Sequence, residues 1–332
     1  MRFLFLICFA VFSIRVAAQD TPKAYVLEAI KIMRENSVNK SKINWDLLTT
    51  KAIDSLSNKH SIQEAQSVIQ QILSKLGDSH SQFVPEESVR AYMKTYEEQG
   101  MSFPYPKDSL ISKKMAYISL PAIGNLNSND WKRYVNDFYQ KVMKLQAKRP
   151  QAWLIDVRQN DGGMFVPMFK AIEPFLNAKN VIGSKDNSGQ INYYNITGEN
   201  ITFGQRSIGR IAVPVIKLKK KDIPVYILTS KKTASSGEFI TACFVGQRNA
   251  KIVGTNTQGL TSDNSDFRLS DGSIIILTTG TLIDRNGKTY GEVGKGITPD
   301  KKVTAKELND YIQIIIKDLH QKPENDFDNE MD

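Results

Sequence analysis

The stretch KKTASSGEFI, residues 231–240, places two adjacent serines at the expected start of a helix. Ser235 and Glu238 have the Ser-x-x-Glu spacing of a capping box, in which two side chains satisfy backbone donors of the first turn. The same location would suit a nucleophile, because unpaired N–H groups and the positive end of the helix dipole stabilise negative charge on oxygen. A serine hydroxyl attacks only with the help of a base. The stretch alone leaves both interpretations open.

A base must come from elsewhere in the chain, which contains three histidines. His320 ends the expected last helix and His60 lies in a polar link, so both are poor candidates. His80 lies in the loop LGDSHSQFVP, where Ser79 and Ser81 flank it and Asp78 precedes it, and any of the three can orient its ring. A neutral imidazole with a pKa near 6.5 is a good base at ambient pH. A lone histidine in a loop is also often incidental, so the loop by itself does not decide.

A second candidate feature is the segment IDVRQNDGG at 155–163, which ends in two adjacent glycines. A tight turn that needs positive φ accounts for such a pair. Alternatively, Gly162 or Gly163 presents a backbone N–H to a ligand or an oxyanion, with no side chain in the way. The segment itself does not separate these two interpretations.

These residues need an α/β framework to bring them together. Apolar segments such as AWLIDV and PVYILTS alternate with amphipathic helices from about residue 115, which predicts buried parallel strands in an α/β core. Sites in such cores collect where strands end and helices begin. Both candidate segments fall at such junctions. Before this core, residues 20–75 show apolar residues at helical spacing and predict a small helical cap.

The first residues predict export. MRFLFLICFAVFSIRVAAQD has a basic start, a short apolar run and a small-residue exit, which is typical of a secretory signal cleaved after residue 18. Its apolar run is too short to span a bilayer. We therefore expect a periplasmic or secreted protein that does not span the membrane. The predicted division is a signal peptide (1–18), an N-terminal helical domain (20–90), a linker or lid (91–114), an α/β core (115–320) and a disordered acidic tail (321–332).

Composition narrows the function classes. The 332 residues carry a formal charge of +9, but the basic residues are scattered and no nucleic-acid motif occurs, so we expect no nucleic-acid partner. Of the two cysteines, only Cys243 lies outside the leader, and it sits in an apolar segment where a buried hydrophobe is expected. No disulfide, metal site or cofactor is predicted.

Six segments, taken in order, resemble one family. LGDSHSQFVP, LIDVRQNDGG, TASSGE, IVGTNTQG, LSDGS and GKGITPD follow the order found in the C-terminal processing (tail-specific) peptidases and the tricorn core. These are serine peptidases with a crotonase- and ClpP-like α/β core, and the resemblance covers about 76 to 303. It implies a polypeptide substrate and an acyl-enzyme. It assigns Ser235 as nucleophile, with the N–H groups of Ser236 and of Gly163, or else Gly162, as oxyanion donors.

The resemblance also implies which branch supplies the base. Processing peptidases carry a lysine directly after their Thr-x-Gly, and this chain has Leu260 there. The tricorn-like branch instead uses a histidine preceded by a serine, together with a distant glutamate. His80 and Ser79 fit the pair, and Glu292 fits the glutamate. The implied tetrad has Ser235 attacking, His80 taking its proton, Ser79 orienting His80 and Glu292 supporting Ser79.

The chain departs from the processing peptidases in a second way. Residues 84–114 are fewer than the ~50 that a small domain needs, so no PDZ module is expected, and EESVRAYMKTYEEQG is predicted to be a lid or docking helix. Fold alone does not establish activity. The alternatives are a catalytically inactive hydrophobic-ligand-binding protein on the same fold, and an esterase that uses the same serine.

Overall fold

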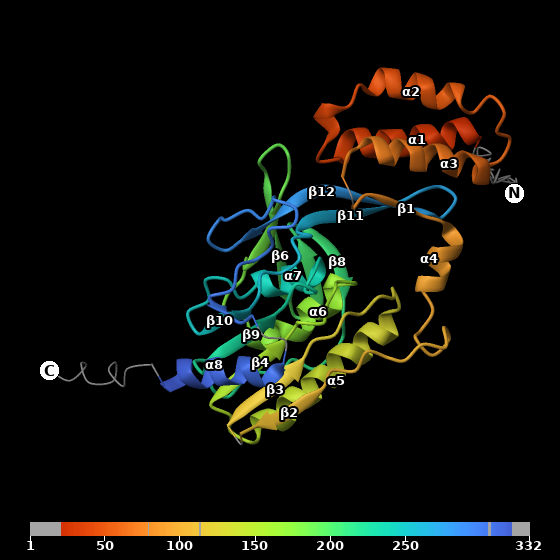
Figure 1. Cartoon of the computed structure of the whole chain (residues 1–332). Coiled ribbons are helices and arrows are strands. Elements are labelled where there is room, and N and C mark those ends of the chain that lie inside the picture. Colours follow the sequence, from red (N-terminus) through yellow and green to blue (C-terminus); the bar gives the residue numbers. More distant parts are fainter. Residues whose placement is uncertain (1–20, 79, 113, 305–306, 321–332) are drawn as a thin grey trace, which may run out of the picture.

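A six-stranded sheet forms the centre of the protein, which the computed structural model describes at residues 21–78, 80–112, 114–304 and 307–320 (Figure 1). The strand order is β13-β10-β9-β4-β3-β2, with all neighbours parallel except the antiparallel edge pair β2–β3. The strands are β2 (Asp108–Ile111), β3 (Met115–Ser119), β4 (Ala152–Asp156), β9 (Val225–Thr229), β10 (Ala250–Gly254) and β13 (Lys301–Lys302). The predicted signal peptide and acidic tail lie outside the described residues.

Helices cover both faces of this sheet, which explains why its strands read as continuous apolar runs. In β4, Trp153 and Ile155 belong to the large core with α5, α6 and α7, whereas Ala152 and Leu154 pack with α8 on the other face. The helices are α5 (Ser128–Gln146), α6 (Phe165–Ile172), α7 (Ser236–Ala242) and α8 (Leu308–His320). A short 3₁₀ helix, η2 (Glu173–Phe175), follows α6. The α/β prediction for this region is confirmed.

A second, seven-stranded sheet lies over α6 and α7. Its order is β1-β12-β5-β6-β7-β8, and β11 pairs with β12 on the other side. Ile182 of β5 and Ile201 of β7 join Ile240 of α7 in one hydrophobic core. The strands are β1 (Gln82–Val84), β5 (Ile182–Lys185), β6 (Ile191–Thr197), β7 (Asn200–Phe203), β8 (Arg206–Arg210), β11 (Ser262–Arg268) and β12 (Ile274–Asp284).

Helices α1 (Pro22–Asn36), α2 (Trp45–Asp54) and α3 (Ile62–Lys75), with the short η1 (Lys40–Lys42), form the predicted N-terminal helical part. The start of α3 is fixed by a capping box between Ser61 and Glu64. The helices do not close their own core, because Leu269, Ile275 and Leu277 of the β11–β12 hairpin complete it. In Figure 1 the three helices lie directly over this hairpin. The cap is therefore packed onto the second sheet.

The segment between the helical part and the core contains α4 (Glu86–Tyr92) and β2. Strand β2 pairs with β3, so the core sheet begins at Asp108, within the range predicted to be linker or lid. The residues that the structure describes in this segment include no PDZ module. None of the described helices combines the length and the apolar character needed to cross a bilayer.

Candidate active site

Ser235 caps the N-terminus of α7 with an unusual backbone, φ 49° and ψ −122°, a region that residues with a side chain rarely adopt. The loop before it is anchored to the loop that follows β4. Thr233 Oγ1 donates to Val157 O at 2.8 Å, and Ala234 N donates to Asn160 O at 3.1 Å. Such strain persists only where the surroundings fix it, and it concentrates at functional sites. The two strand-to-helix junctions predicted from the sequence are thus adjacent in space.

The glycine pair packs directly against Ser235. A Cβ on Gly162 would lie 3.0 Å from Ser235 Cβ, and one on Gly163 would lie 2.3 Å from Ile123 O. Both glycines have positive φ, 125° and 89°. The pair therefore meets the turn requirement and also permits close backbone approach to the serine, so both sequence interpretations describe the same feature.

The N–H groups of the pair have different surroundings. Gly162 N donates to Asn160 Oδ1 at 3.1 Å. This leaves Gly163 as the better candidate for an oxyanion donor. Ser236 Oγ donates to Gly163 O at 2.7 Å, which ties the first turn of α7 to the glycine pair. The two candidate donors, the amides of Gly163 and Ser236, therefore belong to directly connected segments.

Asn160 connects three loops and was not singled out from the sequence. Its buried side chain donates to Leu120 O at 2.8 Å and accepts from Gly162 N, and its carbonyl accepts from Ala234 N. Leu120 follows β3, so the ends of β3, β4 and β9 are joined at this residue. Its place immediately before Asp-Gly-Gly was the only signal available in the sequence.

Glu238 does more than cap its own helix, which is all the sequence predicted for it. It is fully buried. Its Oε2 accepts from Ser235 N at 3.1 Å and from Leu260 N at 2.7 Å, and its Oε1 accepts from Gly259 N at 2.8 Å. Thr257 Oγ1 also donates to Oε1. Glu238 therefore fastens the 257–260 loop, where processing peptidases carry their lysine, to the helix turn behind the nucleophile.

His80 faces a different serine from the one predicted. Its Nδ1 is hydrogen-bonded to Ser262 Oγ, and no hydrogen bond joins it to Ser235 in the described part of the chain. Asp78 accepts from the backbone N of His80 at 3.1 Å and from Thr278 Oγ1 at 3.0 Å. The aspartate thus holds the loop onto β12 through the His80 backbone amide. Ser262 and Ser235 nevertheless line one cavity.

Glu292 has a different partner from the one predicted. Its side chain is 75% exposed and forms an ion pair with Lys295 at 2.9 Å. Ser79, its predicted partner, lies outside the described residues. No hydrogen bond joins Glu292 to His80 in the described part of the chain, and the support of Ser79 by Glu292 stays a prediction. Ser262 is the ring partner that sequence reasoning missed. The reason is that β11, which carries Ser262, was not recognised as a strand.

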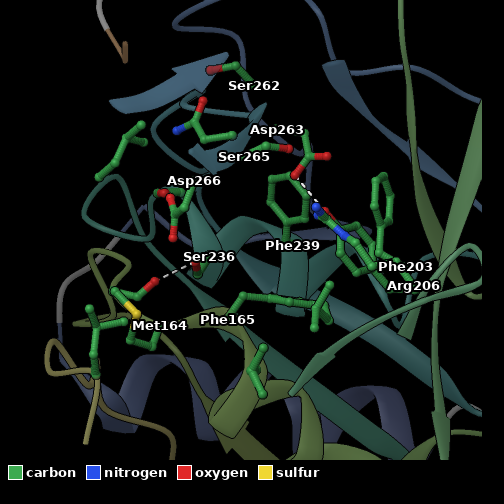
Figure 2. Close-up of a pocket in the computed structure, with 18 of the residues that line it drawn as sticks. Met164, Phe165, Phe203, Arg206, Ser236, Phe239, Ser262, Asp263, Ser265 and Asp266 are labelled. Atoms are coloured by element: carbon green, nitrogen blue, oxygen red, sulfur yellow. Dashed lines mark hydrogen bonds between the residues drawn. The ribbon is translucent and has the colours of Figure 1, made fainter. Parts of the chain in front are cut away.

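A cavity of about 530 Å³ opens beside Ser235 (Figure 2). Its walls come from the start of α6, from α7, and from the edge strands β8 and β11. Figure 2 shows Met164 and Ser236 at one side of it, and Phe203, Arg206 and Phe239 at another. The lining residues used below are Gly163, Phe165, Tyr194, Phe203, Arg206, Ser235, Ser236, Phe239, Ser262, Asp263, Asp266 and Ile276.

Asp263 is the buried charge of this cavity, 5% exposed. Its Oδ1 accepts from the hydroxyl of Tyr194 at 2.6 Å. Burial raises the pKa of this carboxyl above its usual range, although the hydroxyls of Tyr194 and Ser184 and the charge of Arg206 oppose the rise. Neither Asp263 nor Arg206 was predicted, because their chemistry comes from tertiary contacts.

Other reactive groups lie elsewhere. Cys243 is fully buried, as predicted, and burial raises the pKa of its thiol, which disfavours the reactive thiolate. No group of three or more His, Cys, Asp or Glu side chains that could hold a metal ion occurs among the residues that the structure describes. The candidate chemistry therefore rests on Ser235 and its surroundings.

The sequence relatives are peptidases of one kind together with a resistance protein. The chain is 25% identical over 271 residues to the nisin-resistance protein of Lactococcus lactis subsp. lactis, which covers 81% of this chain and 80% of that one. It is 25% identical over 174 residues to the carboxy-terminal processing protease CtpA of Bacillus subtilis, which covers 52% and 32%. The chain thus matches about a third of the length of this processing protease.

Solved structures share the fold, among them the following two. A lipoprotein from Streptococcus agalactiae superposes with a TM-score of 0.71 at 22% identity, over 96% of this chain and 99% of that one. The photosystem II D1 C-terminal processing protease gives 0.61 at 14% identity, over 89% and 96%. The family model described as "Peptidase family S41" matches residues 114–303, which contain Ser235, the glycine pair and most of the cavity walls. The chain therefore belongs to peptidase family S41, and its enzyme class is serine-type peptidase.

Proposed function

We propose that the protein is an exported serine peptidase that cleaves peptide bonds through an acyl-enzyme on Ser235. The observation that carries this proposal is the strained N-terminal position of Ser235, held against Gly162 and facing the cavity. The amides of Gly163 and Ser236 would bind the developing oxyanion. A single donor of this kind is worth roughly 3–4 kcal/mol in the transition state.

His80 is the proposed base. Ser235 Oγ would attack the peptide carbonyl while His80 takes its proton, and the histidine would then protonate the leaving amine. The same histidine would then take a proton from water, which releases the acyl group, and would pass that proton to Ser235 Oγ. Because Nδ1 of His80 is held by Ser262, Nε2 is the ring atom that would take the proton of Ser235, and catalytic hydrogen bonds often tighten only with substrate bound. Ser79 as the orienting residue and Glu292 as its support stay part of the proposal.

The substrate and the location of the protein are inferred from other features. The described residues include no PDZ module, so a substrate tail would have to be held by the cavity itself. One relative is called a nisin-resistance protein, which makes nisin a reasonable first substrate to test. The leader pattern of residues 1–18 supports export.

A fluorophosphonate probe tests the nucleophile. We expect covalent labelling of wild type at Ser235, no labelling of Ser235→Ala, and labelling slowed roughly 10²- to 10⁴-fold in His80→Ala, because the serine loses its base. The exposed Ser57→Ala is the matched control and should label like wild type. Mass spectrometry of the modified peptide identifies the site. Labelling that persists in Ser235→Ala would refute the assignment.

The aromatic walls of the cavity also suit the alternative of an inactive protein that binds a hydrophobic ligand. That alternative expects tight binding of an apolar ligand and no turnover of a peptide library. Rates of hydrolysis of peptides and of small esters distinguish a peptidase from an esterase that uses the same serine. The inactive alternative does not require the close contact between Gly162 and Ser235, whereas an esterase would require it as a peptidase does. Membership of a peptidase family is the reason to favour the peptidase over the esterase.

A further inference from the structure

Asp263 carries a carboxylate oxygen with no hydrogen-bond partner. The residue is 5% exposed, and its Oδ1 accepts a hydrogen bond from the hydroxyl of Tyr194. The other oxygen, Oδ2, is buried and forms no well-aligned hydrogen bond with any described residue, and the hydroxyl of Ser184 lies near the carboxyl without closing one. A buried unsatisfied carboxylate oxygen is costly and calls for an explanation. Because Asp263 lines the cavity beside Ser235, a ligand that enters the cavity can supply the missing donor.

A second carboxylate reaches the same cavity because β11 is irregular. Asp263 and Asp266 are three positions apart, which in a regular strand would place them on opposite faces. The pairing of β11 with β12 shifts register between Asp263 and Asn264. Such a bulge re-aims the side chains that follow it. Both aspartates therefore line the cavity, with Asp266 on its exposed rim.

One cation faces these two carboxylates. Arg206 lines the cavity from β8, and its charge acts on both Asp263 and Asp266, yet its guanidinium makes no hydrogen bond or ion pair with the described residues. Figure 2 shows Arg206 near Asp263, with Phe203 beside it. Two carboxylates against one guanidinium leave one negative charge in excess. The cavity therefore attracts a cation and repels an anion.

The walls next to Asp263 are aromatic. The rings of Phe165 and Tyr194 pack at 4.9 Å between centroids, those of Tyr194 and Phe203 at 4.5 Å, and those of Phe165 and Phe239 at 5.9 Å. Aromatic faces hold the aliphatic stem of a long basic side chain and attract its charged end. An aromatic wall that leads to a partly unpaired carboxylate suits lysine and arginine.

We propose that this part of the cavity is the subsite for a lysine or arginine side chain of the peptide substrate, with Asp263 Oδ2 accepting a hydrogen bond from its charged end. Asp266 adds attraction at the rim, and Arg206 is a competing cation whose charge opposes the binding of a basic side chain. This inference rests on the proposed function for the statement that the ligand is a peptide. It adds a specificity-determining residue, Asp263, that takes no part in bond cleavage.

The test uses pairs of peptides that differ only in lysine against norleucine at one position. A peptide library first locates the position, relative to the cleaved bond, at which basic residues are enriched. We expect wild type to prefer lysine, and Asp263→Asn to lower the lysine-to-norleucine ratio of kcat/KM at least roughly tenfold, since a desolvated charge pair is lost. Arg206→Gln should raise the ratio. Asp222→Asn, 91% exposed and outside the cavity, is the matched control.

Binding of the same peptides to Ser235→Ala separates the two proposals. If wild type turns over no peptide, the proposed peptidase function fails, and the binding preference still decides the subsite. Preferential binding of the lysine peptide, lost in Ser235→Ala/Asp263→Asn, supports it. Equal binding of both peptides, binding of neither, or a ratio unchanged by Asp263→Asn overturns it. If Asp263→Asn does not fold, Asp266→Asn and Arg206→Gln must shift the ratio in opposite directions, or the subsite is rejected.

Discussion

At the scale of single residues, the chemistry around Ser235 depends on the side chain that Gly162 lacks. The hypothetical Cβ at 3.0 Å from Ser235 Cβ would be nearer than side chains normally approach. The loop with the glycine pair can approach Ser235 this closely only because Gly162 has no side chain. On the other loop, Ser235 itself has an unusual positive φ of 49° where the two loops meet.

Gly162→Ala should therefore damage the site as well as the fold. We expect the rate of fluorophosphonate labelling to fall roughly 10- to 100-fold, because the new methyl group displaces Ser235 from its attack geometry. Gly287→Ala is a matched control, since Gly287 also has positive φ but a Cβ there would contact nothing within 4 Å. Each variant should lose about 1–3 kcal/mol of stability from backbone strain. Equal labelling rates in the two variants would contradict this role.

Residues recognisable from short motifs were located from the sequence, whereas residues defined by long-range contacts were not. Ser235 and Gly163 were located because six short segments in order resemble one family, although each stretch alone left a structural interpretation open. Asp263 and Arg206 gave no local signal, since their meaning depends on a β-bulge and on two edge strands far apart in the chain. The predicted tetrad remains a prediction. Glu292 lies in an exposed ion pair, which spacing along the chain does not reveal.

At the scale of elements, Glu238 joins α7 to the 257–260 loop. Its carboxylate accepts from the amides of Ser235, Gly259 and Leu260 and from Thr257 Oγ1. Without it these buried and partly buried donors would lose their acceptor. The loop that follows β10 is therefore held through one side chain to the helix that presents the nucleophile.

Glu238→Gln keeps the shape but replaces one acceptor oxygen with a donor that faces backbone N–H groups. We expect a loss of roughly 2–4 kcal/mol in the free energy of unfolding, measured by urea denaturation. Labelling of Ser235 should also slow, because the first turn of α7 loses its anchor. The exposed Glu87→Gln is the control and should unfold like wild type. A Glu238→Gln variant as stable as Glu87→Gln would show that the loop is held by other contacts.

The buried central strands were predictable because both faces of β4 and β9 are covered, which leaves long apolar runs in the sequence. The second sheet was not predictable in this way. Strands such as β11, SDNSDFR, place polar side chains toward the cavity or solvent, and β6, INYYNIT, carries few aliphatic residues. Strands of this kind are specified by their partners more than by their own composition.

At the scale of the whole molecule, α8 is fastened to the central sheet through Asp318. The carboxylate is 6% exposed and accepts from Tyr226 Oη and Lys251 Nζ, each at 2.8 Å, and it pairs with Lys301 Nζ at 3.2 Å. Although burial opposes ionisation, these hydrogen bonds hold the pKa of Asp318 below its usual range. The last helix is thereby linked to three strands.

Asp318→Asn should cost about 1–3 kcal/mol at neutral pH, measured as the free energy of unfolding. Because the folded pKa is depressed, this stabilisation is complete above the unfolded value of about 3.9 and disappears as pH falls through the folded pKa. The difference between wild type and variant should therefore shrink in acid. Asp222→Asn, an exposed surface control, should show no such trend. A difference independent of pH would assign the loss to packing instead of charge.

Strand β12 packs against the N-terminal helices with one face and lines the cavity with the other, and this arrangement bears on local unfolding. Ile275 and Leu277 point into the core of the N-terminal helices, whereas Ile276 between them lines the cavity beside Ser235. One strand is thus a partition shared by the cap and the site. Local opening generally proceeds in contiguous cooperative units. We therefore expect the helices and this wall of the cavity to open as one unit, so that loss of the cap also disrupts the cavity beside Ser235.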